Sequence, residues 1–126
     1  MDTSGPAQRR ADAPTNETGA QYHLHLSPGQ IPPTVLMPGD PGRVQLMQAS
    51  WDEGQELAFH REYRSARGTY KGVPIGAISS GVGAPSLEIA THEFATIGGE
   101  TIIRVGTCGA LRAEIATGDL LSLIHI

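Results

Sequence analysis

The sequence has one cysteine, few aromatic residues and no long apolar run. As the single cysteine, Cys108 cannot form a disulfide within the chain, which fits a reducing compartment. We expect its side chain to be a small packed residue rather than a nucleophile. No apolar run approaches the roughly 20 residues that a membrane helix needs, and none follows Arg9 and Arg10 as a secretory signal requires. The formal net charge of −4 also disfavours a nucleic-acid or anionic-membrane surface. We therefore expect a cytoplasmic protein.

Glycine and proline, in contrast, are plentiful. The 126 residues include 16 glycines and 9 prolines, and 39% are hydrophobic, which is typical of a small, globular and turn-rich chain. Residues 1–20 are small, polar and contain proline, so we expect a disordered N-terminal tail there. Residues 21–126 are expected to form the ordered domain.

The order of sequence patterns predicts an α/β fold. A strand at 34–37 is followed by a helix start, with Asp40 as N-cap and Pro41 in the first helical position. A second helix opens at Pro85, has a buried stripe and ends at Gly98. Further strands are expected at 57–59, 63–70, 73–79, 101–105 and from about 120, with a hairpin turn at 71–72. Apolar strands alternating with helices indicate a three-layer α/β domain.

Arg104 interrupts a run of residues that otherwise looks like a buried strand. Ile102, Ile103 and Val105 show no alternation with polar residues, which is typical of a strand covered on both faces. A buried arginine needs a partner, either a carboxylate inside the protein or an anion that binds and leaves. In open α/β sheets, ligands bind beyond the carboxyl ends of the strands, and Arg104 lies near such an end.

The segment PGDPGR, residues 38–43, follows the first strand in the same way. A glycine before a helix start lets an anion approach free backbone N–H groups, and Arg43 could add a two-pronged contact to phosphate oxygens. An ordinary turn with a solvated arginine is the alternative.

Other motifs are weaker. Gly81 and Gly83 begin a near-copy of the dinucleotide-binding fingerprint, but Ser86 replaces its third glycine, and the acid expected after the next strand is absent. His23 and His25 fall on one face of an expected strand, without the further ligands that a metal site needs.

Two charged motifs also have structural explanations. The segment 60–62 (HRE) has the pattern of a charged loop with an internal ion pair. His92 and Glu93 are expected to form a solvated or half-buried pair on the second helix.

Taken together, five segments resemble the first half of the nucleoside phosphorylase-I family in order and spacing. They are YHLHL, VLMPGDPGRV, HREYRSARGTYKGVPI, SSGVGAPSLEIATHEF and TIIRVGTCGALRAEIATGD. YHL and HREYR are most similar to uridine phosphorylases. VLMPGDP, GTYKG and RVGTCGA, the last with Cys108, also resemble the bacterial hexameric purine nucleoside phosphorylases. The resemblance implies a three-layer α/β/α fold with a central mixed sheet. It also implies phosphate-dependent cleavage of a nucleoside, with uridine as the first expectation and a purine nucleoside as the alternative.

The resemblance also implies roles for particular residues. Phosphate would be bound by Gly39, Arg43, Arg104 and Thr107, and by Arg61 reaching from a neighbouring subunit. The ribose would be contacted by Thr107 and by the neighbour's His23. A monovalent cation, such as potassium, would lie between subunits at Glu62, Val82 and Ser86. No metal or organic cofactor is expected for the reaction itself, and the protein is expected to be a homo-oligomer, a hexamer, with shared sites.

The resemblance covers residues 22–121 and stops where the family continues. The ribose-binding glutamate and the base pocket belong to a second half that this sequence does not contain. We expect a truncated chain, in which the final LSLIHI is either a real strand or an imposed ending. A catalytically inactive fragment that binds anions or pairs with other subunits, and a dinucleotide-binding module, remain the alternatives.

Overall fold

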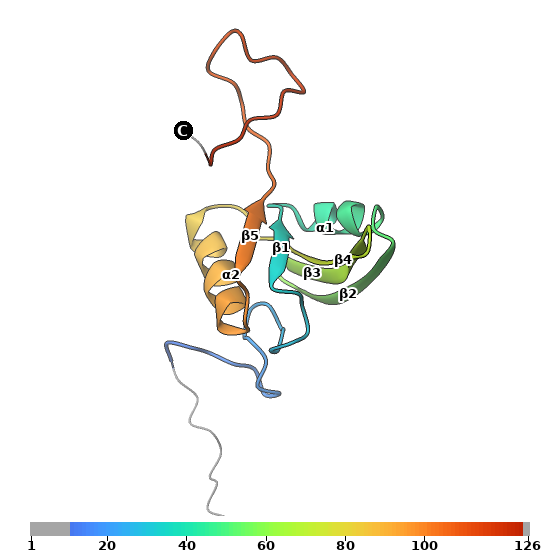
Figure 1. Ribbon diagram of the computed structural model, residues 1–126. Coiled ribbons are helices and arrows are strands. Elements are labelled where there is room, and N and C mark those ends of the chain that lie inside the picture. The colour runs from blue at the N-terminus through green and yellow to red at the C-terminus, as the bar shows by residue number, and fades with distance from the viewer. Residues whose placement is uncertain (1–10, 125–126) are drawn as a thin grey trace, which may run out of the picture.

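The computed structural model describes residues 11–124, which contain one mixed sheet and two helices (Figure 1). In chain order the elements are β1 (Thr34–Met37), α1 (Pro41–Gln48), β2 (Glu53–His60), β3 (Tyr63–Tyr70), β4 (Val73–Ile78), α2 (Ala84–Thr96) and β5 (Thr101–Arg104). The sheet order is β2-β3-β4-β1-β5. β1 pairs in parallel with β4 and β5, whereas β3 is antiparallel to both β2 and β4.

The two helices cover opposite faces of this sheet. Val35 and Met37 of β1 are fully buried in a cluster with Phe94 of α2. Leu36, between them, packs instead with Val44 of α1. Because successive side chains of a strand point to opposite faces, α1 and α2 must lie on different sides of β1. The prediction of a three-layer α/β/α domain with a mixed sheet is confirmed.

Local signals set the ends of the helices and the hairpin as predicted. Asp40 caps α1, because its Oδ1 accepts a hydrogen bond of 2.8 Å from the Gly42 amide. α2 is followed by Gly98, whose φ of 99° suits glycine. Lys71 and Gly72 both have positive φ, as a tight turn between β3 and β4 requires.

Two predictions about strands are wrong. β5 is not covered on both faces, since it lies at the edge of the sheet and Ile103 is 49% exposed. Only Ile102 packs against the α2 cluster, because no helix covers the other face of β5 within the described residues. The strand expected from about residue 120 is not formed either. The chain runs away from the sheet after β5 (Figure 1), so residues 120–124 have no described neighbour with which to pair their backbone groups.

The segment before β1 is organised by turns. Residues 1–10 of the tail that was predicted to be disordered lie outside the described residues. Farther along, Asn16 accepts side-chain hydrogen bonds from the amides of Thr18 and Ala20, and Thr15 forms a bridge with Gln21. Between residues 11 and 124, no helix has the length and apolar character needed to cross a bilayer.

Candidate functional site

The carboxyl ends of β1, β4 and β5 meet at one edge of the sheet. Gly39 follows β1, and its carbonyl accepts a hydrogen bond of 3.0 Å from the amide of Gly81, which follows β4. The Arg104 guanidinium, at the end of β5, lies against Gly39: a Cβ atom built there would be 3.3 Å from Arg104 Nη2. A side chain at position 39 would press on the guanidinium, so the glycine leaves room for it there. The structure therefore brings Gly39 and Arg104 together, as a shared anion site requires.

Arg104 is bound by neutral groups. Its Nη1 donates to the carbonyl oxygens of Met37 at 3.1 Å and Val105 at 3.0 Å. No salt bridge in the described part of the chain involves this arginine. The two carbonyls orient the guanidinium but leave its positive charge without a counter-charge. Because the residue is exposed, an anion from solution can reach it.

The other predicted phosphate-binding residues make no described contact with this pair. Arg43 is half-buried in the first turn of α1, four residues after Gly39. Thr107 is exposed and belongs to the segment after β5 that has no regular structure. Arg61 lies in the turn between β2 and β3, exposed and with a φ of 55°.

A second polar cluster forms where that turn meets the start of α2. Ser86 Oγ lies 2.9 Å from Glu62 Oε1 and 2.6 Å from the carbonyl oxygen of Ser80. Tyr63 OH donates to the carbonyl of Ser86 at 3.1 Å. The hydrogen bond from its own backbone amide lowers the pKa of Glu62, and the Ser86 hydroxyl lowers this pKa further. Burial raises the pKa of the Tyr63 phenol.

This cluster holds two of the three residues expected at a monovalent cation. Glu62 and Ser86 are in contact, and Val82 lies in the loop that leads to α2, with its side chain 96% exposed. The donors present are carboxylate, hydroxyl and carbonyl oxygens, the kind that hard cations prefer. No group of three or more His, Cys, Asp or Glu side chains suited to a metal occurs in residues 11–124. The donor set therefore fits an alkali cation better than a transition metal.

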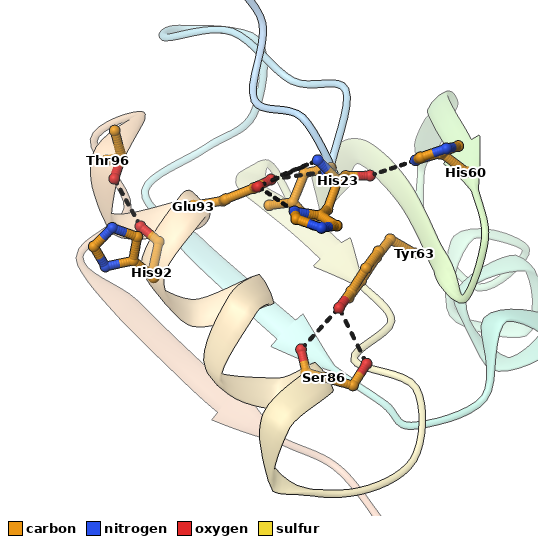
Figure 2. Close-up of polar contacts among 8 residues, drawn as sticks. His23, His60, Tyr63, Ser86, His92, Glu93 and Thr96 are labelled. Atoms are coloured by element: carbon orange, nitrogen blue, oxygen red, sulfur yellow. Dashed lines mark hydrogen bonds and ion pairs between the residues drawn. The ribbon is translucent and has the colours of Figure 1, made fainter. Parts of the chain in front are cut away.

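His23 lies in a turn and not on a strand, so that prediction is wrong. The His25 amide donates to the Gln21 carbonyl at 2.9 Å, and His25 has a φ of 55°, which closes a turn and separates the two rings. His25 stacks on His60 with ring centroids 4.0 Å apart. The His23 ring instead faces α2, where its Nδ1 lies 2.7 Å from Glu93 Oε1 (Figure 2).

The expected ion pairs within motifs 60–62 and 92–93 are not formed in the described structure. The Glu62 carboxylate bonds Ser86, and no salt bridge joins it to Arg61. His92 is exposed, whereas Glu93 is buried and bound to His23. In both motifs the acid turns toward a partner far away in the sequence.

Comparison with known proteins shows the family of the chain. The family model described as the phosphorylase superfamily matches residues 33–123, which include β1 to β5 and both helices. The chain belongs to the phosphorylase superfamily. The resemblance drawn from the sequence is thereby confirmed. Three of the segments that carried it contribute Gly39, Gly81 and Arg104 to the carboxyl edge of the sheet.

Its relatives within the superfamily act on different nucleosides. Over 111 residues, the chain is 51% identical to uridine phosphorylase of Thermococcus kodakarensis, covering 88% of this chain and 40% of the relative. It is 39% identical over 101 residues to guanosine phosphorylase of Halorubrum lacusprofundi, with coverages of 80% and 42%. The crystal structure of uridine phosphorylase from Vibrio fischeri matches with a TM-score of 0.74 and 40% identity, covering 76% of this chain and 40% of that one. The chain thus spans about two-fifths of the length of these superfamily members.

Sequence reasoning missed Glu93 as a partner of His23. The residues are 70 positions apart, so no local spacing connects them. The usable signal was the position of Glu93 on α2, in the same stripe as the buried Ala90, Phe94 and Ile97. An acid within a buried helical stripe needs a partner from another element.

Proposed function

We propose that this chain is the phosphate-binding part of a nucleoside phosphorylase that cleaves uridine with phosphate to uracil and ribose 1-phosphate. The observation that carries the proposal is the guanidinium of Arg104. It is fixed by two carbonyl groups against Gly39, it has no described counter-charge, and it is open to solvent.

Phosphorolysis needs what such a site offers. Phosphate must lose part of its hydration shell and be directed at the anomeric carbon of the nucleoside, which is a task of positioning and electrostatics. Arg104 and the backbone at Gly39 would bind the phosphate, with Arg43 and Thr107 closing around it. Arg61 would complete the charge compensation from a neighbouring subunit. As the base departs, positive charge develops on the ribose, and the adjacent phosphate stabilises it.

The remaining roles follow from the same proposal. His23 would contact the ribose bound to a neighbour, together with Thr107 of that site. Glu62, Ser86 and the loop at Val82 would hold potassium between subunits and so fix the turn that carries Arg61. These shared sites need a homo-oligomer, which is proposed to be a hexamer. The protein is proposed to be cytoplasmic, where phosphate is available as the co-substrate.

A purine nucleoside is the second candidate substrate. The similarity to guanosine phosphorylase of Halorubrum lacusprofundi, at 39% identity, favours it. The described residues do not include the base-binding groups that the resemblance assigns to the second half. An inactive fragment is the third candidate, because this chain spans about 40% of its relatives.

The test is a product assay on the full-length protein, with the reading frame extended past Ile126. Uridine, guanosine and inosine are each incubated with and without phosphate, and ribose 1-phosphate and free base are measured. Phosphate-dependent release of uracil in preference to the purines supports the first candidate, and the reverse preference supports the second. Absence of any phosphorolysis would contradict both.

A further inference from the structure

Glu93 is a buried acid whose carboxylate binds the turn that carries His23. Its side chain is 5% exposed, and its carboxylate accepts hydrogen bonds from two backbone amides (Figure 2). The His23 amide lies 3.1 Å from Oε2, and the Leu24 amide lies 2.9 Å from the same oxygen. The His23 ring adds a third contact, with Nδ1 at 2.7 Å from Oε1. A single carboxylate on α2 therefore fixes both the backbone and the ring of this histidine.

The geometry determines which ring nitrogen carries the proton. An ionised carboxylate only accepts hydrogen bonds, so Nδ1 must be the donor in the contact with Glu93. In the neutral imidazole, the other nitrogen then has no hydrogen and acts as an acceptor. We propose that Glu93 is the positioning residue that holds His23 in the Nδ1–H form and directs Nε2, as an acceptor, toward a hydroxyl group of the substrate ribose. The ribose contact itself rests on the proposed function.

The surroundings of His23 support a positioned and accessible ring. The edges of Tyr22 and Tyr63 pack on it, with ring centroids 5.0 Å and 6.1 Å away. From the opposite side, His60 Nδ1 lies 3.1 Å from the carbonyl oxygen of His23, so β2 restrains the same turn. The ring is 20% exposed and lines a cavity of about 360 Å³. The ring is therefore partly open to the cavity that it lines together with Glu93.

The tautomer can be measured without any substrate. The full-length protein is labelled with ¹⁵N in its histidines, and the His23 ring is assigned from a His23→Gln variant. Long-range ¹H–¹⁵N spectra are expected to show His23 in the Nδ1–H form. The same spectra of Glu93→Gln should show a mixture with the Nε2–H form, whereas Glu100→Gln, which changes an exposed acid between α2 and β5 that does not line this cavity, should leave His23 unchanged. An Nε2–H form in the wild type, or an unchanged Nδ1–H form in Glu93→Gln, would overturn the proposal.

Kinetics then test whether Glu93 acts through His23. Glu93→Gln should raise the KM for the nucleoside about tenfold, the equivalent of one hydrogen bond, without changing the KM for phosphate. In a His23→Ala background the same change should have no further effect on the nucleoside KM. A further rise there would show that Glu93 supports the fold in general, and the positioning role would be refuted. Absence of phosphorolysis in the wild type would contradict the proposed function, while the spectra would still decide the tautomer.

Discussion

Glu62 lies in the turn between β2 and β3, and its carboxylate accepts a hydrogen bond from the Ser86 hydroxyl of α2. Its own amide and Ser86 Oγ both donate to the carboxylate, and together they lower its pKa from the ordinary value of 4.5. A carboxyl group with a lowered pKa stabilises the fold above its ordinary pKa. That contribution is lost as the pH falls through the lower, folded value.

We predict that Ser86→Ala raises the pKa of Glu62 toward 4.5 but not all the way, because the backbone hydrogen bond remains. A ¹³C titration of the Glu62 carboxyl group in the full-length protein measures this directly. The difference in unfolding free energy between wild type and Ser86→Ala should shrink as the pH falls below 4.5. Thr96→Ala removes another α2 hydroxyl, one that bonds the carbonyl of His92, and serves as control. A Glu62 pKa that is the same in Ser86→Ala and wild type would rule out this coupling.

The sequence was most informative about single residues where their surroundings are local. Asp40 caps α1 as expected, because capping involves only the amide two residues later. The partner of His23 could not be predicted, since Glu93 reaches it only after α2 has packed on the sheet. Arg104 was recognised as unusual, but its exposure was not foreseen, because an apolar strand pattern does not show whether a covering element is present.

At the scale of elements, the loop between β4 and α2 is closely fitted to the turn between β2 and β3. Gly81 has a φ of 68°, and a Cβ atom at this position would lie 2.6 Å from Glu62 Cγ and 2.8 Å from Ser86 Oγ. Gly72 in the β3–β4 hairpin has a similar φ of 76°, with nothing within 4 Å of such an atom. The two glycines share a backbone requirement but differ in the space around them.

These two positions make a matched pair of substitutions. We predict that Gly72→Ala lowers the unfolding free energy by about 1 kcal/mol, the cost of a left-handed backbone at a residue with a side chain. Gly81→Ala should cost clearly more, because Glu62 and Ser86 must also move. Urea denaturation of the full-length variants provides the comparison. Equal losses at the two positions would show that the loop relaxes freely and that the close fit has no energetic consequence.

The helices and the hairpin were predictable because their signals lie within a few residues. A cap, a proline or a pair of residues with positive φ determines where an element starts or turns. The edge position of β5 and the absence of a strand after it were not predictable from β-propensity. A strand forms only beside a neighbour, and Thr101–Arg104 has β1 on one side and no described strand on the other.

At the scale of the molecule, residues 105–124 expose several large apolar side chains. Leu111 and Leu120 are fully exposed, and Ile103 and Val105 at the free edge of the sheet are partly so. The chain covers 40% of the length of uridine phosphorylase of Thermococcus kodakarensis, which is one reason to examine these side chains in a longer protein. The expected assignment of Arg61 and His23 to a neighbour's site adds a second reason to examine the assembled, full-length protein.

Shared sites can be tested by mixing two inactive variants. Arg61→Ala lacks the arginine that is proposed to reach the phosphate site of a neighbouring subunit. Arg104→Ala lacks the arginine that is proposed to bind phosphate in the site of its own subunit. If the oligomer forms as proposed, subunits exchanged between the two variants should regain part of the activity, because some sites then contain both arginines. Arg104→Ala mixed with itself is the control. Complete inactivity of the mixture after verified subunit exchange would place both arginines in the same subunit's site.

The central claim is that Arg104 binds the phosphate co-substrate. The most direct test is the KM for phosphate of Arg104→Ala in the full-length protein, beside Arg67→Ala, which removes an exposed arginine from β3. Loss of a charged hydrogen-bonding group should raise this KM roughly 10- to 100-fold in Arg104→Ala, with little change in unfolding free energy. Arg67→Ala should behave like the wild type. An unchanged phosphate KM in Arg104→Ala would remove Arg104 from the site and contradict the account.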